Sequence, residues 1–309
     1  MTRTLLLVHG RSQEDRDPDE LKAEWVDALR RGLARRGLTL PVPESAIRFP
    51  HYGSTLRDLT RRPADGVAEI IVRSTGQDLD PHRARFLEAT LREIALGAGA
   101  GEDELFPHPP GAVVERGAAQ SERMRTILGV LDRRAPGLGG AAIALLVDDV
   151  HAYLRIPAIT RRIDDGVRAA LASSGGPCVV VAHSLGSVVA YRVLRDGDGR
   201  NVPLLVTLGS PLGVSTIRRT LRPLRHPEGV GRWLNARDVR DLVALHALDA
   251  ERFPVTPPVE DLATVDNHMP NRHGIAGYLG DPDVAARIHD ALCPGGPDVT
   301  GHAPGRGPA

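Results

Sequence analysis

The segment PCVVVAHSLGS, residues 177–187, passes from an apolar run through a turn into a helical pattern. A short run rich in valine and bounded by turn residues is typical of a buried strand in a parallel sheet. The turn is centred on Ser184, and the small residues Ala182 and Gly186 flank it, so that strand and helix can approach each other. This pattern predicts a strained strand-to-helix turn that raises the Ser184 hydroxyl above the carboxyl end of the strand.

Apolar runs and helical patterns alternate on both sides of this segment. We predict strands at residues 4–8, 46–49, 177–182, 202–208, 232–235 and 262–265, and helices at 18–36, 157–172, 187–195 and 284–292. Alternation of strands with helices predicts an α/β fold: a mostly parallel, twisted sheet of about six strands with helices on both faces.

The alternation is interrupted between about residues 54 and 155. Helical periodicity appears there around 80–96, 118–134 and 140–154, separated by joints rich in glycine and proline. We therefore predict one domain over residues 1–293 that carries a helical cap insertion at about 54–155. The tail at 294–309 has nine Gly or Pro in 16 residues and is predicted to be disordered.

Composition and charge exclude several classes of protein. The chain has 309 residues, and Lys+Arg and Asp+Glu both number 39. A net charge of zero argues against a nucleic-acid partner, which needs a positive field. The two cysteines form no cluster with metal-ligand spacing, so we expect no metal and no cofactor. We find no signal peptide and no stretch of 18 apolar residues, and therefore expect a cytoplasmic protein without an integral membrane segment.

Ser184 is the candidate nucleophile. The flanking pattern is A-x-S-x-G instead of the G-x-S-x-G of the common nucleophile elbow, and a methyl group often fits at the first position. A serine hydroxyl attacks well only when an imidazole takes its proton and a carboxylate orients that imidazole. The alternative is an ordinary loop whose serine caps the following helix.

Four segments together resemble the lipase/esterase branch of the α/β-hydrolase superfamily. They are VVVAHSLGSVVAYRVL (179–194), LVTLGSPLG (205–213), RWLNARDVRDLVAL (232–245) and NRHGIAGYL (271–279). The resemblance covers about 1–52 and 156–292 and implies an α/β-hydrolase fold with catalytic residues in the order serine, acid, histidine.

The resemblance supplies candidates for the acid and the base. Asp241, followed by an apolar pair, matches the position of the acid, and Asp238 is the alternative, although it is better suited to stabilising its own loop. His273 opens the helix-like HGIAGYL and matches the position of the base, with His268 as the alternative. His183 adjoins Ser184, but neighbouring side chains diverge in a tight turn, so we assign it a structural role.

The resemblance also implies an oxyanion hole built from backbone amides. The pair His9-Gly10 ends the first predicted strand, and the donors carried over are the amides of Arg11 and Leu185. His51 and Tyr52 end another strand on the same side of the sheet, where they line the substrate pocket or serve packing.

The expected function is serine hydrolysis of a carboxylic ester or thioester through an acyl-enzyme. The expected substrate is a small acyl ester or a lipid-like molecule, with the insertion as a lid. A peptidase and an acyltransferase on the same scaffold remain open, as does a non-catalytic binding or scaffold module.

Overall fold

A computed structural model describes residues 3–10, 16–52, 80–106, 116–134, 137–269 and 271–293. Its centre is a single six-stranded sheet in the order β2-β1-β3-β4-β5-β6, in which every neighbouring pair is parallel. The strands are β1 (Thr4–Val8), β2 (Ile47–Arg48), β3 (Cys178–His183), β4 (Val202–Leu208), β5 (Val230–Ala236) and β6 (Glu260–Leu262). This architecture confirms the predicted α/β class and the predicted parallel sheet.

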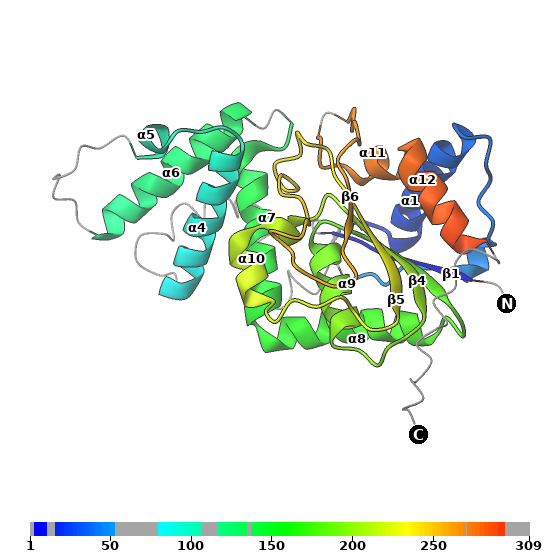
Figure 1. Ribbon diagram of the computed structural model, residues 1–309. Coiled ribbons are helices and arrows are strands. Elements are labelled where there is room, and N and C mark those ends of the chain that lie inside the picture. Colours follow the sequence, from blue (N-terminus) through cyan, green and yellow to red (C-terminus); the bar gives the residue numbers. More distant parts are fainter. Residues whose placement is uncertain are drawn as a thin grey trace, which may run out of the picture.

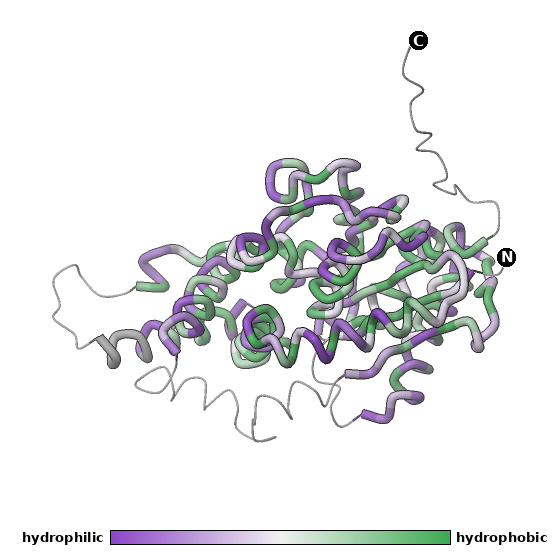
Figure 2. Tube along the Cα trace, turned by 90° about the horizontal axis from the view of Figure 1, so that it is seen from below, coloured by the Kyte–Doolittle hydropathy of each residue, from purple (hydrophilic) through white to green (hydrophobic). Residues whose placement is uncertain are grey.

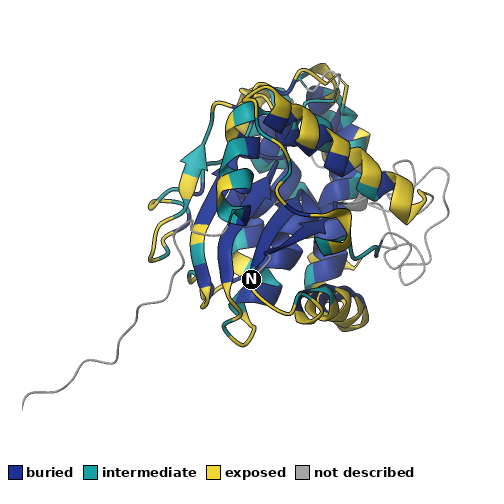
Figure 3. Cartoon of the chain, turned by 90° about the vertical axis from the view of Figure 1, so that its right-hand side faces the viewer, coloured by how far each residue is buried: buried dark blue, intermediate teal, exposed yellow. Residues whose placement is uncertain are grey.

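The two faces of the sheet are covered by different helices, and β1, β3 and β4 are buried along their whole length (Figures 1 and 3). Leu5, Leu7 and Val179 pack on one face against α1, α11 and α12, whereas Leu6 and Val180 pack on the other against α8 and α9. These helices are α1 (Pro18–Ala34), α8 (Pro157–Ala172), α9 (Leu185–Arg195), α11 (Ile275–Leu279) and α12 (Pro282–Leu292). Because side chains alternate along a strand, continuous apolar runs supply both layers at once.

The order of the strands creates a switch point between β1 and β3. From β1 the chain turns to β2 on one side, and all later strands lie on the other side. In open α/β sheets, ligands bind in the crevice outside the carboxyl ends of the strands at such a point. His9 and Gly10 follow β1 and Ser184 follows β3, so the predicted site residues lie at this edge.

The helices at 81–155 form a second layer with its own apolar core, on the left of Figure 1. They are α4 (Pro81–Gly97), α5 (Glu102–Leu105), α6 (Arg116–Arg134) and α7 (Gly139–Arg155). Helix α7 joins this layer to the sheet, since Ile143 and Val147 pack into the helical core whereas Leu146 and Val150 pack into the sheet core. Figure 2 shows apolar segments along the trace in both layers. We call α4–α7 the cap helices.

Several boundaries differ from those predicted. Helix α1 ends at Ala34 instead of residue 36, because Gly37 adopts φ +67° and the Leu38 amide turns back to the Leu33 carbonyl. The last strand lies at Glu260–Leu262 instead of 262–265, and α5 and α10 (Ser215–Thr220) were not predicted. Helix α11 lies within the segment HGIAGYL, which the sequence showed as helix-like. Residues 54–79 and 107–115 of the predicted insertion, and the tail at 294–309, lie outside the described residues.

No single helix among the described residues is both long and apolar enough to cross a membrane. One bent pair, Glu122–Arg134 with Gly139–Arg155, reaches that length and composition only when its two members are taken together.

Candidate active site

Ser184 occupies a strained turn at the carboxyl end of β3. Its backbone lies at φ 54° and ψ −127°, and it is the one non-glycine residue with positive φ in the described part of the chain. Glycines allow the close approach that this turn needs. A Cβ on Gly186 would lie 2.4 Å from the carbonyl oxygens of both Val8 and His9, and one on Gly10 would lie 2.9 Å from Cβ of Ser184. Such strain persists where the surrounding structure enforces it, and it clusters at functional sites.

A continuous chain of hydrogen bonds joins Ser184 to His273 and Asp241. The His273 Nε2 atom lies 2.8 Å from the Ser184 Oγ atom, and its Nδ1 atom lies 2.8 Å from the Asp241 Oδ2 atom. All three side chains are buried. The Val243 amide donates to the other Asp241 oxygen, Oδ1, at 3.0 Å. The carboxylate accepts from Nδ1–H, which leaves Nε2 free to take the serine proton.

The two alternative residues lie outside this chain. Asp238 is buried, and its oxygens accept from the backbone amides of Arg240 at 2.8 Å and Asn267 at 2.9 Å. Burial raises the pKa of Asp238, but hydrogen bonds from Arg240 and from the Asn267 amide outweigh it, so the net pKa is lowered. His268 points to Asp266 at 3.4 Å and its side chain is 79% exposed.

Asn267 holds the loop that carries His273. Its Nδ2 group donates to the carbonyls of Arg272 at 2.8 Å and Gly274 at 2.7 Å, on either side of the histidine. Gly277 makes room for this amide, because a Cβ there would lie 1.8 Å from the Asn267 Oδ1 atom. Sequence reasoning did not single out Asn267, since its contacts form only when the loop folds back.

Tyr278 is a second residue that the sequence analysis missed. Its hydroxyl donates to the Asp241 Oδ2 atom at 2.7 Å and accepts from the Asp238 amide at 3.2 Å. Burial, followed by the charge of Asp241, raises the pKa of the Tyr278 hydroxyl well above its usual range, so it stays a donor. The available signal was a tyrosine inside the quoted motif 271–279, in a chain with only 4 tyrosines.

His183 lies beneath His273, as its predicted structural role requires. Its ring centre is 4.7 Å from that of His273, and its Nε2–H group donates to the His273 backbone carbonyl at 2.8 Å. Burial, with a smaller effect from the charge of His273, places the pKa of His183 well below its usual value. The ring is therefore neutral and positions the loop of His273 instead of exchanging protons with Ser184.

One of the two predicted oxyanion donors lies within the described structure. Leu185 is the first residue of α9, and the first amides of a helix have no intrahelical acceptor. The amide of Leu185 thus lies at the positive end of the helix dipole, next to Ser184. Arg11, the other predicted donor, lies outside the described residues.

The residues predicted to line a substrate pocket, His51 and Tyr52, lie against His9. The rings of Tyr52 and His9 stack with centres 4.0 Å apart, and the Tyr52 amide donates to the His9 Nε2 atom at 3.1 Å. The Tyr52 hydroxyl donates to the His9 carbonyl. The His51 ring centre lies 5.2 Å from that of His9. These contacts hold the end of β1 at the switch point, and neither residue lines the cavity described next.

A cavity of about 240 Å³ opens beside the hydrogen-bonded chain. His273, Asp241 and Leu242 form one wall, and Arg134 and Leu138 from the cap helices and their connection form another. Arg240 and Arg272 complete it. The cavity therefore lies between the cap and the loops that carry the candidate acid and base.

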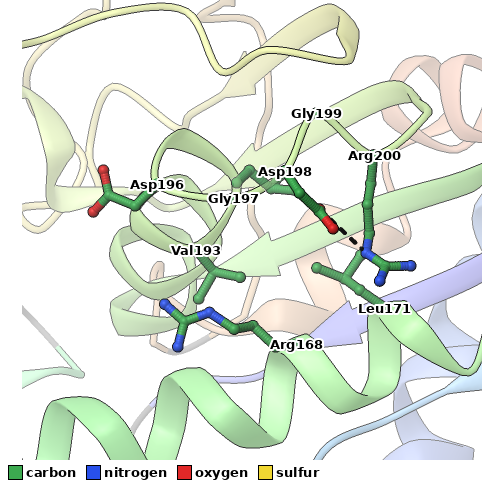
Figure 4. A pocket seen from close by; sticks show the side chains of 9 residues that line it. Arg168, Leu171, Val193, Asp196, Gly197, Asp198, Gly199 and Arg200 are labelled. Carbon is green, nitrogen blue, oxygen red and sulfur yellow. Dashed lines mark ion pairs between the residues drawn. The ribbon is translucent and has the colours of Figure 1, made fainter.

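A larger cavity of about 390 Å³ lies at the opposite end of the strands from Ser184, beside the amino end of β4 (Figure 4). It is lined by the turn 196–200 between α9 and β4, together with Arg168 and Leu171. Asp198 pairs with Arg200 at 3.5 Å across the turn. The turn precedes β4, so the cavity is remote from Ser184.

No group of three or more His, Cys, Asp or Glu side chains within the described ranges has an arrangement that would hold a metal ion. Comparison of the chain with protein-family models, with curated proteins and with solved structures found no match in any of the three.

Proposed function

We propose that this chain is a serine hydrolase of carboxylic esters or thioesters, lipase- or esterase-like, built on an α/β-hydrolase fold. The observation that carries the proposal is the hydrogen-bonded chain Asp241–His273–Ser184, whose two links both measure 2.8 Å. The strained Ser184 backbone at a switch point of a parallel sheet supports the same proposal.

The proposed reaction follows from the positions of these atoms. The Ser184 Oγ atom attacks the carbonyl carbon while His273 Nε2 takes its proton, and Asp241 stabilises the resulting imidazolium. The Leu185 amide donates to the carbonyl oxygen as negative charge develops on it. The protonated His273 then gives its proton to the leaving alcohol or thiol, which leaves an acyl group on Ser184. Water, deprotonated by His273, attacks the carbonyl carbon of this ester. The bond to Ser184 Oγ then breaks, His273 returns the proton to that oxygen, and the acid is released.

In this proposal the cap helices form the lid of the acyl or alcohol pocket. Leu138 and Arg134 from this layer line the same cavity as His273, so the cap takes part in shaping the site. Closing such a cavity excludes water and strengthens electrostatic interactions within it.

The test combines a fluorophosphonate probe with turnover of a panel of para-nitrophenyl esters of increasing chain length. We expect the wild type to be labelled at Ser184 and to hydrolyse at least one ester, and Ser184→Ala to lose both properties. Ser187→Ala is the matched control, because Ser187 is equally buried on α9 and its hydroxyl bonds to the Ser184 carbonyl and to Ser210.

A folded wild type that is neither labelled nor active would overturn the proposal and favour a non-catalytic binding module. Activity that survives Ser184→Ala would place the nucleophile elsewhere.

A further inference from the structure

The cavity beside His273 is lined mainly by positively charged side chains. Its lining includes three arginines from three separate segments: Arg134 at the end of α6, Arg240 after β5, and Arg272 before α11. The remaining charged lining group is Asp241, besides the titratable His273. Both Asp241 oxygens already accept hydrogen bonds, Oδ1 from Val243 and Oδ2 from His273 and Tyr278. The lining thus presents three guanidinium groups and one carboxylate that is already satisfied.

Carboxylates outside the lining hold the three arginines in place. Glu104 binds Arg134 at 2.9 Å, Asp238 binds Arg240 at 3.2 Å, and Asp266 binds Arg272 at 3.2 Å. None of these three acids lines the cavity. An arginine anchored on one side has less conformational entropy to lose when its remaining donors bind a ligand.

Donor groups remain on these anchored arginines. The side-chain hydrogen bonds of Arg240 use Nε and Nη2, and those of Arg272 use Nη1. Those of Arg134 use Nη1 and Nη2, with Glu104 and the Gly99 carbonyl as acceptors. Within the described residues this leaves Nη1 of Arg240, Nε and Nη2 of Arg272, and Nε of Arg134 without an acceptor. Guanidinium donors match the geometry of carboxylate and phosphate oxygens and form stronger hydrogen bonds with anions than with neutral groups.

We infer that the substrate of this site carries an anionic group, a carboxylate or a phosphate, that binds between Arg134, Arg240 and Arg272. This inference rests on the proposed function, because it places the anion beside the proposed base. The volume of about 240 Å³ is below the roughly 300–1,000 Å³ of sites that bury drug-sized ligands, so the group that enters is small. Leu138 and Leu242 provide apolar walls for the short carbon chain between the anion and the scissile carbonyl.

The experiment compares two esters of equal acyl chain length, para-nitrophenyl hemisuccinate, which ends in a carboxylate, and para-nitrophenyl butyrate, which ends in a methyl group. We expect kcat/KM to favour the hemisuccinate by about tenfold, the value of one charge-assisted hydrogen bond. Salt should raise KM for the hemisuccinate and not for the butyrate, because it screens the arginines.

Arg134→Gln and Arg240→Gln should each reduce the ratio of the two kcat/KM values. Arg133→Gln is the matched control: Arg133 binds the same Glu104 at 3.0 Å, but its side chain is 63% exposed and does not line the cavity. Its ratio should equal that of the wild type. Succinate and inorganic phosphate serve as competitive inhibitors, and the stronger one identifies the kind of anion that the site prefers.

The two proposals fail in different ways. If neither ester is cleaved and Ser184 is not labelled by a fluorophosphonate, the proposed function is wrong. If both esters are cleaved but the butyrate is preferred, or the ratio is the same in Arg134→Gln and Arg240→Gln as in the wild type, the anion site is refuted and the hydrolase stands. Inhibition by neither succinate nor phosphate would also refute the anion site.

Discussion

The hydroxyl of Tyr278 donates a hydrogen bond of 2.7 Å to the Asp241 Oδ2 atom, the same oxygen that lies 2.8 Å from His273 Nδ1. One carboxylate oxygen is therefore held by two side chains. Because Tyr278 also accepts from the Asp238 amide, a single phenol fixes the loop that carries Asp241, the candidate acid.

From this geometry we predict that Tyr278→Phe lowers kcat about tenfold with little change in KM. The substitution removes one hydrogen bond that positions the Asp241 carboxylate, and it removes no group that binds substrate. The buried Asp238 amide loses its acceptor, which costs about 1–3 kcal/mol of unfolding free energy. Steady-state kinetics and urea unfolding measure the two effects. Tyr191→Phe is the control, since Tyr191 is a buried tyrosine whose hydroxyl bonds to the Arg225 carbonyl at 3.2 Å. An equal loss of kcat in both variants would show that Tyr278 acts only through stability.

Substitutions of the two aspartates in the 238–241 loop should affect different properties, kcat for Asp241 and unfolding stability for Asp238. Asp241→Asn should lower kcat by about 10³–10⁴-fold, because the amide misorients the imidazole. Asp238→Asn should retain most of kcat and lose about 1–3 kcal/mol of stability, since Asp238 accepts from two backbone amides and an asparagine offers one oxygen. A reversed ranking of the two kcat values would make Asp238 the acid.

The two histidines of the following loop provide a similar pair. His273→Ala should abolish turnover and fluorophosphonate labelling, because no other base lies at 2.8 Å from the Ser184 hydroxyl among the described residues. His268→Ala should keep both, since its side chain is 79% exposed and points to Asp266. Probe labelling followed by mass spectrometry decides between them. Labelling of both variants at the wild-type rate would refute a Ser–His mechanism.

At position 184, the strained backbone should make glycine more stable than a residue with a side chain, although the proposed reaction requires serine. Its φ of 54° is unfavourable for any side chain, and glycine relieves that strain. The strain relieved is about 1–3 kcal/mol, and glycine costs roughly 0.5–1 kcal/mol of additional unfolded-state entropy. We therefore predict that Ser184→Gly is about 1 kcal/mol more stable than Ser184→Ala by urea unfolding. A less stable glycine variant would mean that the turn is not strained.

His9 should make the protein sensitive to acid. Burial lowers the pKa of His9 from 6.5 to about 4, so between these values the native state binds fewer protons than the unfolded state. Stability is then fully present above pH 6.5 and falls as the pH drops, by about 2 kcal/mol at pH 5.

Urea unfolding at pH 7.5 and pH 5 tests this linkage. His9→Asn, which does not titrate, should lose about 2 kcal/mol less than the wild type over that interval. His268→Asn is the control, because it makes the same substitution at a histidine whose side chain is 79% exposed. Equal slopes for His9→Asn and the wild type would contradict the assignment.

The central strands could be predicted from the sequence because burial on both faces requires unbroken apolar runs. Val179–Val181 is such a run, and β3 lies there. The edge strand Glu260–Leu262 was predicted two residues late, since a polar edge strand has no apolar run to mark it. Helices α5 and α10, which were not predicted, span 4 and 6 residues, too few for the helical period to repeat.

The candidate site also contains residues that the sequence predicts and residues that it does not. Ser184, Asp241 and His273 could be proposed from local motifs and their resemblance to a family, and the structure brings them together. The supporting contacts of Tyr278 and His183 join residues 37 and 90 positions apart, and no local pattern encodes them. Those of Asn267 are local, but they depend on how the loop 267–274 folds.

The apolar core of the cap helices includes Leu242, the residue after Asp241. Glu93 on α4 also accepts hydrogen bonds from the Ser215 amide at 2.9 and 3.0 Å. Protein engineers could therefore not exchange the cap helices without disturbing the loop that carries Asp241. A replacement that lacks a packing partner for Leu242 would loosen the backbone beside Asp241, and in the proposed hydrolase it would change turnover as well as substrate selectivity.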